Sequence, residues 1–351
     1  MKYSIIVPVY NRPDEVDELL QSLTTQSYKD FEVVIVEDGS THQCKDVCNK
    51  YADVLALHYY DKPNSGPGQS RNYGAERASG EWLIILDSDV VLPQGYLQSV
   101  EDYLSKENEK PRNRETGNPK PTTAWGGPDA SHPSFTPVQK AISYSMTSFF
   151  TTGGIRGGKK KLDKFFPRSF NMGIQREVYK ELGGFSKMRF GEDIDFSYRI
   201  VEAGYHTALI PNAWVWHKRR TDFRKFWRQV YNSGIARINL EKRHPGTLKL
   251  VHLLPAVFTV GVVALTLLLL IGLLTGLYHL TWLAAAPILT YALLISTDSA
   301  IANKSMKVGL LSIPAAFVQL MGYGCGFIES WWKRCVMKKD EFQAYEKNFY
   351  K

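Results

Sequence analysis

Short apolar runs alternate with segments of helical spacing over residues 1–90. The apolar runs predict buried strands at 3–10, 31–36, 54–58 and 82–86. Between them, apolar residues recur every three or four positions, as Val16, Leu19 and Leu23 do. Helices are therefore expected at 14–25, 45–51 and 70–78. This alternation of strands and helices predicts an α/β fold with a mostly parallel sheet that helices cover.

The pattern changes after residue 104 and again after residue 250. Residues 105–137 are rich in Pro, Gly, Asn, Lys and Glu and predict a long loop. Residues 153–164 form a Gly- and Lys-rich loop, either a solvated basic loop or a clamp over a diphosphate or anionic acceptor. Uncharged runs then cover 253–274, 280–296 and 308–328, and the first is long enough to cross a bilayer as a helix.

Basic residues flank these uncharged runs in three groups. The groups are Lys242, Arg243 and Lys249; Lys304 and Lys307; and Lys333, Arg334, Lys338 and Lys339. The positive-inside rule places all three groups in the cytoplasm, which an odd number of crossings does not allow. Either one run is re-entrant or interfacial, or the rule fails at one end. The third run, which contains Pro314 and three glycines, is the candidate for the irregular one.

Composition narrows the class of partner. A chain of 351 residues has room for roughly two domains of ordinary size. Its net charge of +8 suits an anionic partner such as a nucleotide diphosphate or a phospholipid surface. No nucleic-acid-binding motif is present, so nucleic acid is not expected as a partner. The four cysteines lack metal-site spacing, and a strand-like run follows Lys2 directly, so the N-terminal part is expected to stay in the cytoplasm.

Two acidic residues mark the end of the last predicted strand. Asp87 and Asp89 follow the run 82–86 and are separated by Ser88. Open α/β folds bind their ligands at this edge of the sheet. Two carboxylates so close together suit a hard divalent cation, Mg²⁺ or Mn²⁺, shared with substrate phosphates. The alternative is an ordinary surface turn after a strand.

Other polar motifs lie where neighbouring elements begin or end. The segment PVYNR at 8–12 closes the first strand, and EDGS at 37–40 closes the second. The segment GPGQSR at 66–71 precedes a predicted helix, where backbone N–H groups and a guanidinium hold an anion well. Later in the chain come GEDIDF at 191–196 and WVWH at 214–217. In a parallel sheet, both strand ends face the same crevice as Asp87.

Taken together, these motifs resemble the GT-A glycosyltransferases of family 2, from residue 3 to about residue 220. The order PVYNRP, EDGS, SRN, Asp-Ser-Asp, NMGIQREVYKELGGF and GEDIDFSYRI is specific as a set. The resemblance implies a nucleotide-binding α/β sandwich. It also implies an enzyme that moves a sugar from a nucleotide diphosphate sugar to an acceptor hydroxyl or lipid phosphate, with inversion at the anomeric carbon.

The same resemblance implies roles for residues that bind the donor. Pro8, Tyr10 and Arg12 would border the nucleotide base. Asp38 would accept a hydrogen bond from that base, most simply from N3–H of uracil. Arg71 would reach the ribose or the pyrophosphate.

Metal binding and catalysis follow from the resemblance in the same way. Asp87 would face the ribose and the metal, Asp89 would ligate the metal, and His217 would complete its shell. The metal, Mn²⁺ or Mg²⁺, would neutralise charge on the departing diphosphate. Asp193, with Glu192 beside it, would be the general base, and a single base fits inversion. The alternative is an acidic helix start that complements the helix dipole.

The pattern and the resemblance divide the chain into four regions. These are a GT-A catalytic domain at 1–222, an amphipathic interfacial region at 223–250, a transmembrane region of two to three helical segments at 251–330, and a basic cytoplasmic tail at 331–351. We expect a multi-pass protein of a bacterial-type inner (cell) membrane with its catalytic domain in the cytoplasm. Residues 224–240 lack the Gln-x-x-Arg-Trp element of processive polysaccharide synthases, which disfavours a polymerase.

The expected function is transfer of a sugar, most simply from a UDP-sugar, to a lipid or lipid-linked glycan acceptor in glycan biosynthesis. A polyprenyl-phosphate sugar synthase is an alternative, in which the acceptor is already a phosphate and the general base matters less. A non-catalytic membrane scaffold that binds nucleotide sugars is another. The presence of Asp87, Asp89 and Asp193 argues against the scaffold.

Overall fold

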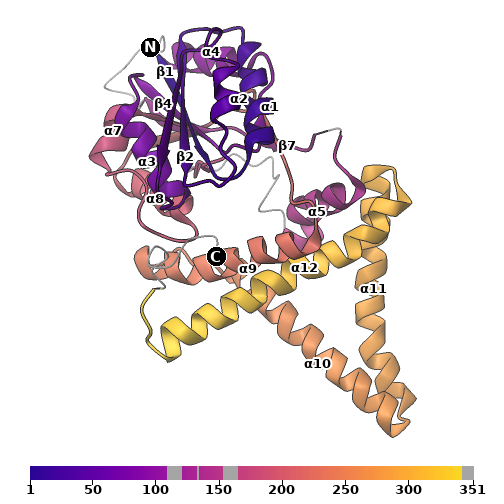
Figure 1. Cartoon of the computed structure of the whole chain (residues 1–351). Coiled ribbons are helices and arrows are strands. Elements are labelled where there is room, and N and C mark those ends of the chain that lie inside the picture. The colour runs from indigo at the N-terminus through magenta and orange to yellow at the C-terminus, as the bar shows by residue number, and fades with distance from the viewer. Residues whose placement is uncertain (109–120, 133, 153–164, 342–351) are drawn as a thin grey trace. The chain divides into compact units, whose positions relative to one another are not determined.

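The computed structural model describes residues 1–108, 121–132, 134–152 and 165–341. They form two compact units (Figure 1). The first unit is drawn from residues 1–132 and 165–218, and the second from 134–152 and 219–341. Each unit is described separately below.

Among the described residues of the first unit, seven strands form a central sheet in the order β3-β2-β1-β4-β8-β6-β9. Its strands are β1 (Tyr3–Val9), β2 (Phe31–Asp38), β3 (Leu57–Lys62), β4 (Trp82–Leu86), β6 (Thr122–Gly126), β8 (Asn171–Gln175) and β9 (His206–Leu209). β3, β2, β1 and β4 pair in parallel, and β6 pairs in parallel with β9. Only β8 runs antiparallel to its two neighbours, β4 and β6. The predicted α/β fold with a mostly parallel sheet is confirmed.

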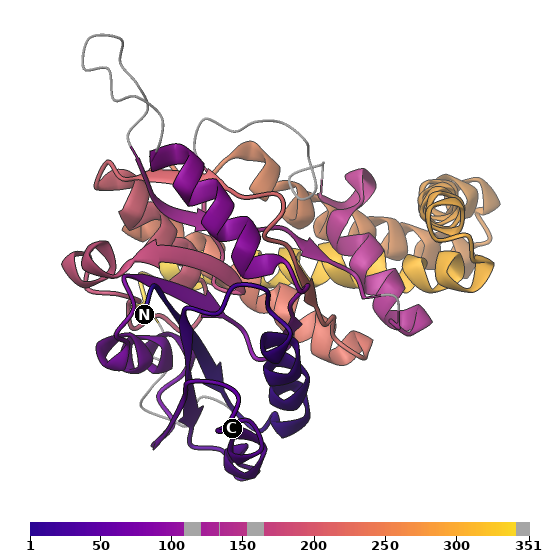
Figure 2. The same cartoon turned by 90° about the horizontal axis from the view of Figure 1, so that it is seen from above.

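Helices cover both faces of this sheet (Figures 1 and 2). α1 (Pro13–Thr24), α2 (Lys45–Asn49) and α4 (Tyr96–Asn108) pack on one face, and α3 (Pro67–Arg77), α7 (Arg176–Glu181) and α8 (Glu192–Glu202) on the other. The alternation of side chains along β1 supplies both layers: Ile5 and Val7 enter the first, and Ile6 enters the second. Because β1 is buried on both faces, its sequence is apolar apart from Ser4.

A small second sheet brings the end of the first unit's chain back to the strand ends. It consists of β5 (Val90–Val91), β10 (Val215–His217) and β7 (Asp129–Ala130), in that order. β10 runs antiparallel to β5, with His217 opposite Val90. This register places His217 beside the Asp87–Asp89 segment, although about 130 residues separate them in the sequence.

The long loop predicted at 105–137 is wrong for most of the residues that the structure describes. α4 continues to Asn108, and β6 and β7 both fall inside the predicted loop. β6 lies within the sheet between β8 and β9. Its flanking glycines concealed it, yet they permit tight packing: a Cβ on Gly127 would lie 1.7 Å from the carbonyl oxygen of Ala213. The basic loop predicted at 153–164 lies outside the described residues.

The second unit is helical in the part that the structure describes. Its helices are α5 (Pro137–Thr147), α6 (Phe149–Thr152), α9 (Phe223–Arg243), α10 (Leu254–Thr275), α11 (Tyr278–Asn303) and α12 (Met306–Trp331), with short helical turns at Leu250–His252 and Trp332–Val336. By length and composition, the three helices that contain the uncharged runs are apolar enough to cross a membrane. α12 continues as one helix through Pro314 and its glycines. That the third run is the re-entrant or interfacial one stays a prediction.

Candidate active site

A hollow at the carboxyl ends of β1 and β2 is lined by Pro8, Val9, Tyr10, Asp38 and Pro67. It brings together Pro8 and Tyr10, which were expected to border the nucleotide base, and Asp38, which was expected to accept a hydrogen bond from it. The hollow lies at the edge of a parallel sheet where α/β folds bind their ligands.

The loop that follows β1 is tied to the loop that follows β2. Asn11 adopts a left-handed backbone conformation, with φ 54°. Its side-chain oxygen accepts hydrogen bonds from the backbone N–H groups of Thr41 (2.8 Å) and His42 (2.9 Å). Asparagine tolerates this conformation better than most residues. The rim of the hollow is thereby held by the polypeptide itself.

Asp38 is engaged by the chain that leads into α3. Its buried carboxylate accepts from Lys62 Nζ (2.5 Å), Ser65 N (2.8 Å) and Gly66 N (2.9 Å). Lys62 lies opposite Asp38 in the pairing of β3 with β2, which explains how the ammonium reaches the carboxylate. Asp38 thus organises the loop at 62–66, as well as lining the hollow.

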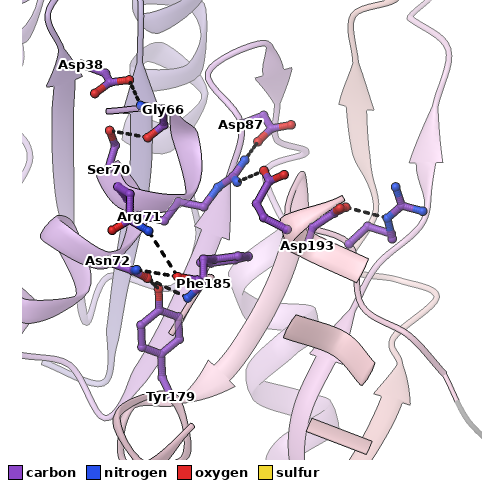
Figure 3. Close-up of polar contacts among 12 residues, drawn as sticks. Asp38, Gly66, Ser70, Arg71, Asn72, Asp87, Tyr179, Phe185 and Asp193 are labelled. Atoms are coloured by element: carbon purple, nitrogen blue, oxygen red, sulfur yellow. Dashed lines mark hydrogen bonds and ion pairs between the residues drawn. The ribbon is translucent and has the colours of Figure 1, made fainter. Parts of the chain in front are cut away.

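Arg71 links the end of β4 to the start of α8 (Figure 3). Its Nη2 donates to Asp87 Oδ1 at 2.7 Å, and its Nη1 donates to Glu192 Oε1 at 3.0 Å. The guanidinium also lies over the ring of Phe185, with its central carbon 5.2 Å from the ring centroid. Arg71 is buried, so the two carboxylates balance a charge that would otherwise be costly to hold there.

The residue after Arg71 fixes α3 against the turn at 183–185 (Figure 3). Asn72 Nδ2 donates to the Phe185 carbonyl at 2.8 Å, and its Oδ1 accepts from Phe185 N at 2.8 Å. Gly184 has φ 64°, and a Cβ there would lie 2.4 Å from Asn72 Oδ1. Gly184 therefore serves packing behind Arg71, whereas a Cβ on Gly183 would meet nothing within 4 Å and only its φ of 71° favours glycine. Gly173 does the same in β8, where a Cβ would overlap the ring of Trp125.

Asp87, Asp89 and His217 form a cluster whose ligand atoms all lie within 4.8 Å of one another. His217 Nε2 is 3.3 Å from Asp89 Oδ1, and His217 Nδ1 is 3.8 Å from Asp129 Oδ2. The imidazole also stacks on Phe170 with ring centroids 5.0 Å apart. Two carboxylates and an imidazole fit a divalent cation such as Mn²⁺, and Asp129 adds negative charge on the Nδ1 side of the imidazole ring.

Arg12 lies at the metal cluster, whereas the resemblance implied that it would border the base. Its Nη1 is 2.8 Å from Glu15 Oε1 and 3.8 Å from Asp89 Oδ2. Arg12 precedes α1, at the carboxyl end of β1, and this position brings its side chain towards the end of β4. The guanidinium adds positive charge beside Asp89, where a diphosphate would also gain from it.

The acidic residues at the start of α8 separate into different environments. Asp193 Oδ2 accepts from Arg168 Nε at 2.7 Å, whereas Glu192 pairs with Arg71. Asp195 faces elsewhere, accepting from Ser186 Oγ at 2.8 Å. Of the three, Glu192 and Asp193 therefore lie on the side of the metal cluster.

The two neighbouring acids have pKa values displaced in opposite directions. Burial raises the pKa of Glu192 to about 7, although the charge of Arg71 opposes this. Burial also acts to raise the pKa of Asp193, but the charge and hydrogen bond of Arg168, together with the charge of Arg71, hold that pKa below its usual value. At neutral pH Asp193 is therefore ionised, whereas Glu192 is only partly ionised.

Some residues of this site carried no signal in the sequence. Lys62 meets Asp38 only through the register of two parallel strands, and Arg168 meets Asp193 across 25 residues. Asp129 and Phe170 contact His217 from segments without a recognisable motif. The sequence showed only that Lys62 is a charged residue near a predicted strand. The spacing of residues does not identify Asp38 as its partner.

Comparisons with known proteins agree with this geometry. The family model for glycosyl transferase family 2 matches residues 4–183, and that for glycosyl transferase family group 2 matches 161–295. The poly(ribitol-phosphate) β-N-acetylglucosaminyltransferase TarS of Staphylococcus aureus (strain Mu50) is 38% identical over 114 residues, 31% of this chain and 18% of TarS. Glycosyltransferase GlyA of Streptococcus pneumoniae is 34% identical over 100 residues, 28% of this chain and 14% of GlyA.

The curated relatives are much longer than the segment they share with this chain, which spans less than a fifth of TarS and of GlyA. Among solved structures, a mannosyltransferase from Pyrobaculum calidifontis, in complex with GDP-Man and Mn²⁺, covers 95% of this chain and 88% of its own, with a TM-score of 0.56 and 17% identity. That likeness concerns the fold. Because the family model covers more than half of the sequence, the chain belongs to glycosyl transferase family 2, as a glycosyltransferase of the GT-A fold.

Proposed function

We propose that this glycosyltransferase is attached to a membrane and depends on a divalent metal. It transfers a sugar, with inversion, from a nucleotide diphosphate sugar to a lipid or lipid-linked acceptor. The simplest donor is a UDP-sugar. One observation carries the proposal. The metal-ligating set of Asp87, Asp89 and His217 is joined through Arg71 to the acid pair at the start of α8.

The donor is held along the carboxyl edge of the sheet. The hollow at Pro8, Tyr10 and Asp38 takes the nucleotide base, and Arg12 lies towards the diphosphate. Asp87, Asp89 and His217 would hold the cation, which supplies positive charge to offset the charge of the leaving diphosphate. Arg71 keeps Asp87 in place by a direct hydrogen bond.

The reaction needs one proton acceptor from this chain. The acceptor oxygen forms a bond to the anomeric carbon as the bond to the diphosphate breaks, and the proton of the acceptor hydroxyl passes to a carboxylate. Asp193 suits this role because it is ionised at neutral pH, and its partner Arg168 is 40% exposed. Glu192 is held by the buried Arg71, and it keeps its proton to a higher pH than Asp193 does.

The nature of the donor and acceptor is supported by chemistry and by relatives. TarS is named for the transfer of N-acetylglucosamine to poly(ribitol-phosphate), and the Pyrobaculum mannosyltransferase was solved with GDP-Man and Mn²⁺. Three apolar helices in this chain are long enough to enter a membrane. They bring a catalytic unit close to acceptors that are themselves held by lipid.

The test uses full-length protein in lipid nanodiscs with radiolabelled UDP- and GDP-sugars, total membrane lipid and Mn²⁺. We expect label in the lipid extract from one donor, its loss with EDTA and its recovery with added Mn²⁺. Asp89→Asn should abolish transfer. Asp102→Asn, an exposed acid on α4, should leave transfer intact.

Two outcomes would contradict the proposal. Undiminished transfer by Asp89→Asn in EDTA would exclude a metal-dependent site, and label found only in water-soluble products would exclude a lipid acceptor. An acid-labile glycosyl phosphate, formed equally well by Asp193→Asn, would indicate a polyprenyl-phosphate acceptor instead of a hydroxyl.

A further inference from the structure

Helix α12 lies against α9 in the second unit (Figure 1). A Cβ on Gly322 would lie 2.5 Å from Val230 Cγ2, and one on Gly326 would lie 2.0 Å from the Tyr231 carbonyl oxygen. Ser330 Oγ donates to the Ile235 carbonyl at 3.2 Å. Contacts that advance together along both sequences show that the helices run side by side in the same direction.

The orientation of α9 in a membrane is limited by its charges. Arg224, Lys225 and Arg228 are exposed in its first two turns, and Lys242 and Arg243 are exposed at its end. Each such residue costs about 2.5–3.5 kcal/mol at the centre of a bilayer. A basic helix with interleaved aromatics, such as Trp227, lies instead along the lipid headgroups.

α12 meets the other two apolar helices near one end of each. α12 contacts the first two turns of α10, where a Cβ on Gly324 would lie 2.1 Å from Thr259 Oγ1. It contacts α11 in the second half of that helix, where a Cβ on Gly309 would lie 2.5 Å from the Ser296 carbonyl oxygen. At their far ends α10 and α11 meet each other, around Gly272 (Figure 1).

This arrangement differs from three antiparallel spans. Gly309 and Gly324 are about 22 Å apart along α12, at 1.5 Å per residue, so α10 and α11 diverge towards it. Within their most apolar windows, 44% of α12 is buried in protein, against 11% of α10 and 17% of α11. The apolar residues of α12 thus face protein more than those of its neighbours do.

We propose that α10 and α11 cross the membrane as a hairpin, while α12 lies beside α9 on the membrane surface, against anionic lipid headgroups. Two crossings leave both ends of α12 on the side of α9. All three groups of basic residues that flank the apolar runs then lie on one side, as the positive-inside rule requires. This inference rests on the membrane attachment of the proposed function.

The first test locates the end of α12 with a membrane-impermeant maleimide in sealed vesicles of both orientations. The reporter is the native Cys335, which is exposed. Thr221→Cys and Tyr278→Cys, each with Cys335→Ser, mark the start of α9 and the tip of the α10–α11 hairpin. Cys335→Ser alone gives the background from the other thiols. If Cys335 does not react even in detergent, the reporter is Met337→Cys with Cys335→Ser, because Met337 is exposed.

We expect Cys335 to react in the same vesicles as Thr221→Cys and in the opposite vesicles from Tyr278→Cys. Reaction of Cys335 together with Tyr278→Cys would overturn the inference, because it requires three crossings. A protein recovered in the soluble fraction after carbonate extraction would instead contradict membrane attachment itself, so the two failures are distinguishable.

The second test separates a surface helix from a helix that merely re-enters. Spin labels at Leu310→Cys, Met321→Cys and Ile328→Cys, with Cys325→Ala and Cys335→Ser, report depth in nanodiscs containing anionic lipid. The first and last positions are about 27 Å apart along α12. We expect equal, shallow depths. Val260→Cys, Leu267→Cys and Leu274→Cys on α10 should show a maximum at the middle position, and the same maximum in α12 would overturn the inference.

Discussion

Lys62, Arg71 and Arg168 each contact a carboxylate at the edge of the sheet. The pairs divide the acids by function. Asp38 and Asp87 are held in fixed positions, whereas Asp193 is kept ionised by a cation that remains partly exposed. Environment, more than residue type, therefore decides which carboxylate is available for proton transfer.

The pH dependence of kcat/KM distinguishes the two candidate bases. If Asp193 takes the proton, the rate should be constant through neutral pH and fall only in the acid range, because the pKa of Asp193 lies below its usual value. A base at Glu192 would give a limb near pH 7, rising with pH. The measurement is initial rate with saturating Mn²⁺ across the acid and neutral range. A limb near 7 that disappears in Glu192→Gln would refute our assignment to Asp193.

Arg168→Gln should move the acid limb of that profile to higher pH. The guanidinium favours the ionised form of Asp193, so its removal raises the pKa of the carboxylate, by about 1–3 units for a close pair. Arg168→Lys keeps the charge and should retain most of the original profile. Arg176→Gln is the control, since Arg176 donates to the Ala78 carbonyl, away from the acid pair. An unmoved limb in Arg168→Gln would show that Arg168 does not tune Asp193.

At the scale of elements, the pair of Lys62 and Asp38 connects β2, β3 and the start of α3. Lys62→Met should lower the free energy of unfolding of the first unit by about 3 kcal/mol, because it leaves a buried carboxylate without its cation. The double variant Lys62→Met/Asp38→Asn should recover part of the loss. Lys50→Met, which breaks a surface pair with Asp17, should cost less than about 1 kcal/mol. Thermal unfolding followed by circular dichroism measures all three, and equal losses for Lys50 and Lys62 would contradict the argument.

The spacing of apolar residues predicted those helices and strands whose burial shows in their own sequence. The expected strand at 82–86 coincides with β4, and the expected helix at 14–25 differs from α1 by one residue at each end. β6 escaped notice because its burial comes from β8 and β9, which are remote in the sequence. The site followed the same division: strand ends pointed to Asp38 and Asp87, whereas Arg168 depends on a long-range contact that no spacing encodes.

The glycines of α12 test the pairing of helices in the second unit. Gly326→Ala should destabilise the unit by about 1–3 kcal/mol, because the added methyl would overlap the Tyr231 carbonyl. Gly261→Ala in α10 is the matched control, since a Cβ there meets nothing within 4 Å. The two variants are heated in detergent, and the fraction of each that stays monodisperse is measured as a function of temperature. Equal stability of the two variants would mean that the contact of α12 with α9 is not tight in solution.

At the scale of the whole molecule, each unit builds its core from its own residues. Both apolar layers of the sheet consist of residues from the first unit alone. The helical clusters likewise join α5 with α9, α11 and α12, all in the second unit. Yet α5 and α6 come from the chain between β7 and β8, so the two units are interleaved in sequence.

This interleaving predicts how the catalytic unit behaves when it is cut from the membrane region. A chain that ends at Lys218 keeps α5 but loses α9 and α12, so Ile142 and Met146 lose the cover of Phe226 and Val230. Apolar surface exposed in this way promotes association, and we expect aggregation without detergent. Replacing residues 134–160 of the same fragment by a flexible Gly/Ser linker should restore a soluble monomer, because the apolar layers of the sheet include none of the described residues 134–152. Size-exclusion chromatography compares the two fragments, and a monodisperse fragment that still carries α5 would show that this helix does not require the second unit.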